Sequence, residues 1–108
     1  MADLVKICQK SDVSEDEPLA VNPADFPALA VYQVDGDYFV TDNLCTHGNA
    51  LLTDGYQEEG VIECPFHGGA FNIKTGEPTA FPCQVPVKTY NVVVKGDDIL
   101  IEKAINDS

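Results

Sequence analysis

Hydrophobic and polar residues alternate along two stretches of this chain, and a glycine-containing turn interrupts each stretch. Residues 28–42 read ALAVYQV-DG-DYFVTD, two β-rich runs joined by Asp35-Gly36. Residues 89–102 read TYNVVV-KGDD-ILIE, with a second turn around Gly96-Asp97. An Asp-Gly pair between alternating hydrophobic residues is a strong signal for a hairpin. The pattern therefore predicts two β-hairpins.

Shorter apolar runs predict further strands at residues 4–8, 19–21, 61–64 and 70–73. Seven prolines and eight glycines divide the chain at short intervals, which disfavours long helices. We expect residues 11–17, which precede Pro18, to form an acidic loop rather than a helical turn. A chain of 108 residues is the size of one domain. The expected fold is all-β, a sandwich or a small barrel.

Acidic residues dominate the charge. Eighteen Asp and Glu stand against six Lys and Arg, all of them lysine, for a net charge of −12. Such a surface repels phosphate backbones and anionic lipid, so we expect no nucleic acid and no membrane among the partners. An acidic coat that serves only solubility remains equally open. No run approaches the ~18 apolar residues of a membrane helix.

The N-terminus shows no basic region followed by an apolar core, so no signal peptide is expected and the protein should be cytoplasmic. In that compartment its four cysteines are expected to serve metal binding or catalysis rather than disulfides.

Three segments carry no charged residue: 43–53, 64–73 and 78–87. The first holds Cys45 and His47, and the second holds Cys64 and His67, so both histidines of the chain follow a cysteine closely. The third holds Cys83. Neutral loops on an otherwise acidic domain suggest a charge-sensitive metal site.

Thiolate and imidazole are the ligands that zinc, copper and iron–sulfur clusters take in proteins. A catalytic Cys–His pair needs only one cysteine, so the duplication counts against that chemistry. Zinc-finger spacing places two cysteines before two histidines, whereas the order here is Cys, His, Cys, His. That order suits two metals, with each loop giving a thiolate to one and an imidazole to the other. A zinc site of two cysteines and two histidines stays open as an alternative.

The motifs CTHG at 45–48 and CPFHGG at 64–69 resemble the two cluster-binding boxes of Rieske [2Fe–2S] proteins. The similarity extends through DNLCTHGNALLTDGY, ECPFHGGAFNIKTGE and FPCQVPVKTY. It implies one [2Fe–2S] cluster, with Cys45 and Cys64 on one iron and His47 and His67 on the other. The chain looks most like the Rieske ferredoxins of bacterial aromatic-ring-hydroxylating dioxygenases that act in biphenyl and polycyclic-aromatic hydrocarbon catabolism. The resemblance thus implies a monomeric electron-transfer component, not an enzyme, between a flavoprotein reductase and a terminal oxygenase.

The resemblance also implies the layout of the single domain 1–108. An antiparallel β-sandwich base would span 1–42 and 84–108, with a cluster-binding subdomain inserted at 43–83. The histidines would lie at an exposed tip and the cysteines would be buried. We expect Cys8 to be a core residue, and Cys83 to lie near the cluster without binding it.

Two neighbouring classes share the motifs. A terminal oxygenase also needs a mononuclear iron held by two histidines and a carboxylate, and both histidines here are already assigned. The small Rieske-like subunit of an assimilatory nitrite reductase remains an alternative function.

The resemblance further implies a low reduction potential. High-potential relatives carry a disulfide at the positions of Ala50 and Phe66, and serine and tyrosine hydroxyls at the positions of Gly69 and Phe71. Without these donors, and with the negative net charge, we expect a midpoint near the bottom of the Rieske range, about −150 mV.

For docking, we expect an uncharged patch at the tip, formed by Gly48, Asn49, Leu51, Phe66, Gly68, Phe81 and Pro82. Carboxylates further out would steer basic partner surfaces towards it; they are Asp42, Asp54, Glu58, Glu59 and Glu77.

Overall fold

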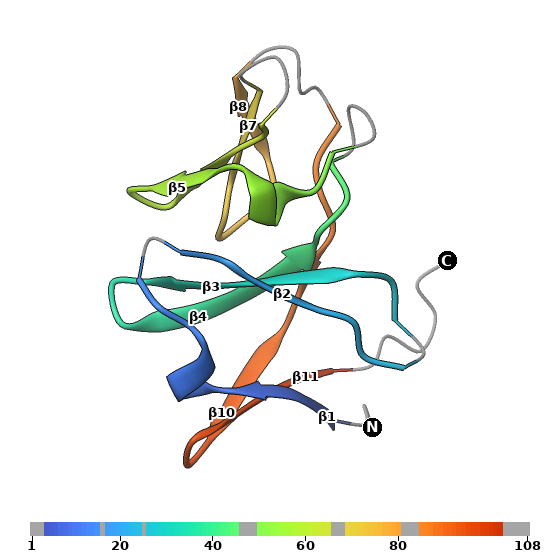
Figure 1. Cartoon of the computed structure of the whole chain (residues 1–108), viewed down its shortest axis with the longest axis vertical. Helices are drawn as coiled ribbons and strands as arrows, with labels where there is room; N and C mark the ends of the chain where they lie inside the picture. Colours follow the sequence, from blue (N-terminus) through green and yellow to red (C-terminus); the bar gives the residue numbers. More distant parts are fainter. Residues whose placement is uncertain are drawn as a thin grey trace.

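The computed structural model of the chain describes residues 4–15, 17–24, 26–45, 50–65, 69–80 and 85–102. In these ranges the strands form three antiparallel sheets, stacked along the long axis of the molecule (Figure 1). The lower sheet has the order β1-β11-β10 and contains β1 (Leu4–Gln9), β10 (Val92–Lys95) and β11 (Asp98–Glu102). The middle sheet, ordered β2-β3-β4-β9, contains β2 (Leu19–Val21), β3 (Leu29–Val34), β4 (Asp37–Asp42) and β9 (Thr89–Tyr90). The upper sheet, ordered β5-β6-β7-β8, contains β5 (Tyr56–Glu58), β6 (Val61–Glu63), β7 (Ala70–Asn72) and β8 (Pro78–Ala80).

The hairpin predicted around Asp35-Gly36 is confirmed as β3 and β4, which pair from Leu29↔Asp42 to Val34↔Asp37. Asp35 and Gly36 have φ values of 53° and 86°. Positive φ at both central residues is the requirement of a type I′ turn, whose twist matches that of the flanking strands.

The second predicted hairpin is shorter than expected. Only β10 and β11 form it, with Gly96 at φ 60° in the turn. Thr89 and Tyr90 pair instead with β4 of the middle sheet, so the chain passes between sheets at Asn91. A hydrogen bond of 2.6 Å from the Tyr90 hydroxyl to the Asp42 carboxylate fixes this pairing.

Strands expected at 4–8 and 19–21 are confirmed as β1 and β2. The strands expected at 61–64 and 70–73 each end one residue early, at Glu63 and Asn72. The expectation of a plain loop at 11–17 is wrong in part, because a 3₁₀ turn covers Lys10–Asp12 and a bridge pairs Ser14 with Glu17.

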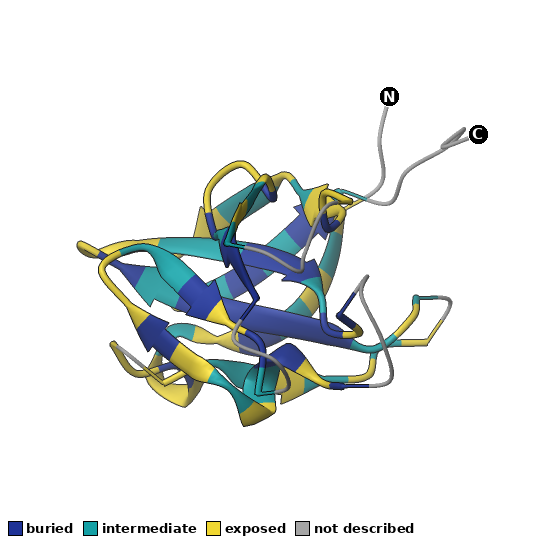
Figure 2. Ribbon diagram, turned by 90° about the horizontal axis from the view of Figure 1, so that it is seen from above, coloured by how far each residue is buried: buried dark blue, intermediate teal, exposed yellow. Residues whose placement is uncertain are grey.

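The middle sheet is buried on both faces, and this divides the core in two. Along β3, alternate side chains face opposite sheets. The lower cluster, between the middle and lower sheets, contains Cys8, Val13, Leu29, Val31, Val40, Ile99 and Ile101. The upper cluster, on the other side, contains Ala30, Tyr32, Val34, Cys45, Ala50, Leu52, Ile62, Cys64, Phe71, Ile73 and Val87. Seen from above, buried segments occupy the centre and exposed residues the peripheral turns (Figure 2).

The all-β expectation is therefore confirmed, and all four strands of the upper sheet lie between Tyr56 and Ala80. They fall inside the segment 43–83 expected to form an inserted subdomain; the boundaries of that subdomain stay a prediction. None of the helices in the described ranges has the length and hydropathy of a membrane-spanning segment.

Candidate metal centre

Cys45 and Cys64 each open a loop of the same length, here named the first cysteine loop (45–50) and the second cysteine loop (64–69). The Cys45 N–H donates to the Ala50 carbonyl at 2.8 Å, and the Cys64 N–H donates to the Gly69 carbonyl at 2.6 Å. Both bonds run from a cysteine to the fifth residue after it. The two loops therefore close in the same way, as the ends of two antiparallel ribbons.

The ribbon that leads into the second loop is a regular ladder. Strands β6 and β7 pair at three successive positions, the last of which joins Glu63 to Ala70 beside the loop. Alternating hydrophobic residues explain this ladder, because Ile62 and Phe71 face the core together and both are fully buried.

The ribbon that leads into the first loop is short. A single bridge joins Leu44 to Leu51, and below it the two legs are held by Asn43. The Asn43 side-chain oxygen accepts a 2.9 Å bond from the Thr53 N–H, and its nitrogen donates to the Thr53 hydroxyl at 3.0 Å. Its backbone N–H donates to Ala28, and its carbonyl accepts from Leu52.

Asn43 is only 1% exposed, so these bonds replace water that the side chain would otherwise require. Sequence patterns gave no reason to select this residue. A short polar side chain at the start of an uncharged segment is found as often in an ordinary turn, so it does not distinguish a structural asparagine from a turn residue.

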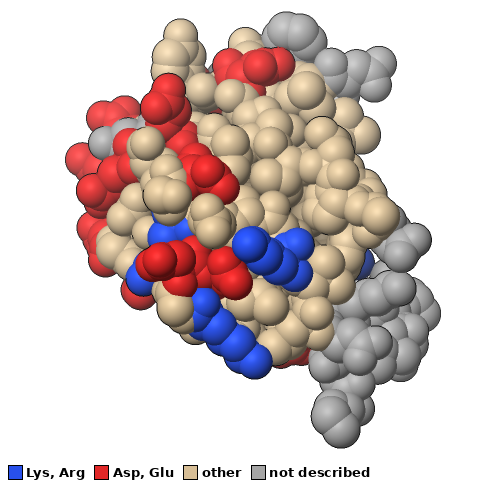
Figure 3. Space-filling view, turned by 60° about the horizontal axis from the view of Figure 1, so that its bottom comes forward, with Lys and Arg blue, Asp and Glu red and all other residues tan. Residues whose placement is uncertain are grey.

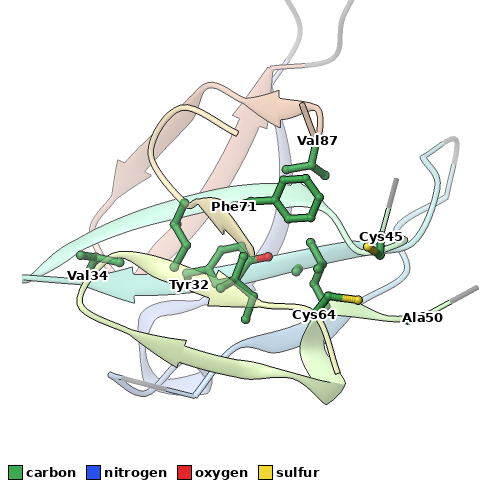
Figure 4. Packing of buried hydrophobic residues seen from close by; sticks show 11 residues of the cluster. Tyr32, Val34, Cys45, Ala50, Cys64, Phe71 and Val87 are labelled. Atoms are coloured by element: carbon green, nitrogen blue, oxygen red, sulfur yellow. The ribbon is translucent and has the colours of Figure 1, made fainter. Parts of the chain in front are cut away.

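Both cysteines are buried, at 2% exposure each, and belong to the upper cluster. Figure 4 shows Cys45 and Cys64 at the same end of that cluster, with Ala50 beside them and Val34 at the opposite end. The expectation of buried cysteines is thus confirmed for both. His47 and His67 fall in sequence within the two loops but lie outside the described residues, as does Cys83. Within the described ranges no three potential metal ligands gather.

Cys8 has a different environment, in the lower cluster on β1. Burial, followed by the nearby carboxylate of Asp12, raises the pKa of its thiol to about 11. A thiol with such a pKa stays protonated at neutral pH and is a poor metal ligand. The expectation that Cys8 is a core residue is confirmed.

The described residues fit the thiolate half of a metal cluster with mixed thiolate and imidazole ligands. Cys45 and Cys64 are buried, and each is the first residue of a six-residue loop. Their thiols are soft ligands at one end of the core, and both loops contain no charged residue. Burying a thiolate is costly unless its charge is compensated, and a bound ferric ion would supply that compensation.

Of the residues expected to form an uncharged patch, the structure describes Leu51; Gly48, Asn49, Phe66, Gly68, Phe81 and Pro82 lie outside the described residues. Leu44 and Leu51, bridged to each other, are 54% and 40% exposed. Asp54, Glu58, Glu59 and Glu77 are exposed. Asp42 was expected among these exposed carboxylates. It is half-buried and accepts the hydrogen bond from Tyr90, so its charge is not fully exposed to solvent.

Lysines contribute little to this end of the molecule. On the lower face, Lys and acidic side chains gather over one part of the surface (Figure 3), and Lys6 pairs with Asp98 at 3.2 Å between β1 and β11. Strands β5 to β8 contain Glu58 and Glu63 but no lysine. Residues 56–80 together hold four glutamates and one lysine, Lys74 in the turn between β7 and β8, so the formal charge of this part of the chain is negative.

A family model described as "Rieske [2Fe-2S] domain" matches residues 3–91. The chain is similar to the solved structure of the "Sphingomonas yanoikuyae B1 ferredoxin", with 56% identity, a TM-score of 0.92 and coverage of 94% of this chain and 100% of the other. A chain of the "complex of reduced oxygenase and oxidized ferredoxin in carbazole 1,9a-dioxygenase" is 40% identical, with a TM-score of 0.86 and coverage of 95% and 97%.

Among sequence relatives, the ferredoxin component of the p-cumate 2,3-dioxygenase system of Pseudomonas putida is 41% identical, over 94% of this chain and 87% of the relative. A putative nitrite reductase small subunit from Mycobacterium tuberculosis is 17% identical with a TM-score of 0.83, over 98% of this chain and 99% of the other. That likeness shows a shared fold alone.

Proposed function

The chain belongs to the Rieske [2Fe–2S] domain family, and we propose that it carries single electrons from a flavoprotein reductase to the terminal oxygenase of a bacterial aromatic-ring dioxygenase system. Sequence relatives at 42% and 41% identity are ferredoxin components rather than catalytic oxygenases. The structural observation that carries the proposal is the pair of buried cysteines, each opening a loop closed by the same backbone hydrogen bond.

We assign Cys45 and Cys64 as ligands of one iron, and His47 and His67 as ligands of the other. A Rieske cluster, when bound, supplies a one-electron redox centre. The described residues support the cysteine half of this assignment through their burial and the shared geometry of their loops. The histidine half rests on the position of each histidine within a cysteine loop.

Two described residues of the upper cluster would keep the cysteine side of the cluster dry and add no side-chain hydrogen-bond donor there. Phe71 is fully buried in the upper cluster, and Ala50 is 5% exposed. Neither side chain donates a hydrogen bond. Since hydrogen bonds to the cluster sulfurs favour the reduced state, the lack of a side-chain donor at these two described positions supports a midpoint near the low end of the Rieske range, about −150 mV.

Docking would use the uncharged surface beside the first cysteine loop. Leu44 and Leu51 offer exposed apolar area there, while exposed carboxylates such as Asp54 and Glu58 lie outside it. Transient redox partners bury small interfaces, below about 1,200 Å². We propose that the carboxylates steer basic surfaces of the reductase and oxygenase, and that the two leucines contribute to the final contact. We propose that the protein functions in the cytoplasm, in the same compartment as its NAD(P)H-dependent reductase.

The alternatives have less support. The nitrite reductase small subunit rests on a shared fold alone. A zinc module does not agree with membership of a [2Fe–2S] family. We therefore retain the dioxygenase system as the proposed context, without assigning its aromatic substrate.

The test is reconstitution. The purified protein, mixed with NADH, a flavoprotein ferredoxin reductase and an aromatic-ring dioxygenase stripped of its own ferredoxin, should be reduced and should restore product formation. Stopped-flow reduction should slow as ionic strength rises, because salt screens the steering charges. Reduction that is absent, or unaffected by salt, would argue against the carrier role or against charge steering respectively.

A further inference from the structure

The segment Leu52–Gly55 follows the first cysteine loop in sequence and also contacts residues that flank Cys64 at the start of the second. Leu52 is fully buried in the upper cluster together with Cys45 and Cys64. Thr53 is tied to Asn43 by the two side-chain hydrogen bonds described above. The segment is therefore fixed to the first loop at one end.

At its other end the segment touches the second loop through Gly55. A Cβ atom placed on Gly55 would lie 1.8 Å from the Glu63 carbonyl oxygen and 3.2 Å from Cδ of Pro65. Glu63 and Pro65 flank Cys64 in sequence, so the contact lies directly beside the proposed ligand. The backbone of Gly55, with φ −95° and ψ −154°, is extended and open to other residues. Glycine is required here for space alone.

We propose that Gly55 is a positioning residue, which sets the separation of the two cysteine loops so that both cysteines reach one cluster. This inference rests on the proposed function. Real Cβ atoms essentially never approach another atom closer than 3.0 Å. Any side chain at 55 must therefore displace the Glu63 carbonyl by about an ångström, because backbone cannot rotate away as a flexible side chain can. Cys64, whose N–H belongs to the same peptide unit as this carbonyl, would move with it and change its position relative to Cys45.

The experiment compares Gly55→Ala with Gly36→Ala, both expressed and purified with their clusters. Gly36 lies at φ 86° with nothing within 4 Å of an added Cβ, so alanine there strains the β3–β4 turn without moving a loop. Three quantities are measured: iron per chain, the half-life of the visible absorption in an iron chelator, and the g-values of the reduced cluster.

Gly55→Ala should shorten the half-life by about tenfold, in line with the loss expected when support around a metal ligand is removed, and should shift the g-values. Gly36→Ala should melt at a lower temperature but keep the half-life and g-values of the unmodified protein. A Gly55→Ala protein with unmodified half-life and g-values would overturn the inference.

If Gly55→Ala does not fold, the variant Thr53→Val tests whether this segment positions the two cysteine loops. Valine adds no bulk towards Glu63 but breaks the bond from the Asn43 side-chain nitrogen, loosening the same segment at its other end. A shortened cluster half-life supports the positioning role, and an unchanged half-life overturns it. Failure of the proposed function has a separate signature, because the unmodified protein would then carry no iron–sulfur cluster at all.

Discussion

The first and second cysteine loops close with the same backbone hydrogen bond, but the segments leading into them are built differently. The second loop continues the β6–β7 ladder, in which three residue pairs and backbone hydrogen bonds hold the register. The first loop has one bridge, Leu44↔Leu51, and depends below it on the buried amide of Asn43. The same loop-closing hydrogen bond is thus supported mainly by a β-ladder in the second loop and by the Asn43 side chain in the first.

This difference predicts where each loop is vulnerable. A ladder of backbone bonds tolerates substitution of its side chains, because each N–H and C=O keeps its partner. The first loop relies on the Asn43 amide beside one bridge and one backbone bond, so removal of that amide should weaken it more and leave the Thr53 N–H without its partner.

The two loops should respond equally when the proposed ligands themselves are changed. Cys45→Ser and Cys64→Ser should each abolish the cluster, because ferric iron–sulfide chemistry prefers the soft thiolate. Iron analysis and the visible spectrum of the purified variants measure this. Cys8→Ser, at a cysteine with a raised pKa in the lower cluster, is the matched control and should keep a full cluster. A Cys64→Ser protein with an unchanged spectrum would contradict the assignment.

The loops should respond differently when an asparagine is removed beside each. Asn43→Ala leaves the part-buried Thr53 N–H without its partner and should cost about 2 kcal/mol in the free energy of unfolding. Asn72→Ala, on β7, loses bonds to the Lys74 and Thr75 N–H groups, which are exposed and can turn to water, and should cost under about 1 kcal/mol. Urea unfolding gives both values; equal losses would remove the proposed asymmetry.

A change within the second loop's ribbon sharpens the comparison further. Phe71 and Leu52 hold equivalent positions, seven residues after their cysteines, and both are fully buried. Phe71→Tyr adds a hydroxyl where the resemblance implies a donor to the cluster in high-potential relatives. If that bond stabilises the reduced state by about 1 kcal/mol, the midpoint rises by about 40 mV. Leu52→Met, which adds no donor, is the control in a redox titration. A midpoint that falls or stays constant in Phe71→Tyr would count against the donor role of this position.

Tyr32 lies in the upper cluster shared by both loops, so a change there should not distinguish them. Its hydroxyl lies 2.8 Å from that of Thr41, which donates its own hydrogen to the Asp42 carbonyl. Tyr32 is therefore the donor of the pair. Tyr32→Phe should cost about 1 kcal/mol at neutral pH.

Burial raises the pKa of Tyr32 well above its ordinary value of 10.0. Above about pH 10 the unfolded chain releases the phenol proton and the folded chain retains it, so stability falls as pH rises. Unfolding curves at pH 9 and pH 11 should show less pH dependence in Tyr32→Phe than in the unmodified protein. Cys8 titrates in both proteins and cancels in the difference. Equal slopes would mean that the phenol ionises freely in the folded state.

The sequence predicted those parts of the structure that are determined by residues close together in the chain. Asp35-Gly36 specifies a turn through its own backbone preferences, and the spacing of Cys45 and Cys64 selects the cysteine loops. Strand β5 was missed because Tyr56-Gln57-Glu58 lacks an apolar alternation, although Glu59-Gly60, with φ values of 51° and 80°, forms the same kind of turn. Strand β8 was missed as well.

Contacts between distant segments had no local signal. The shift from one sheet to another at Asn91 depends on Tyr90 reaching Asp42 across 48 positions. Gly55 looks like an ordinary loop glycine until its distance to Glu63 is known. Such residues are recognised only once the three-dimensional fold brings their partners together.

The central claim is that one iron of a [2Fe–2S] cluster is bound by the two cysteines and the other by the two histidines. Pulsed electron paramagnetic resonance of the purified protein, reduced with dithionite, tests it most directly. The account predicts a rhombic signal from a reduced [2Fe–2S] cluster with hyperfine coupling to two imidazole nitrogens, each lost separately in His47→Ala and His67→Ala. A reduced cluster without nitrogen coupling, or a colourless protein without a signal, would contradict it.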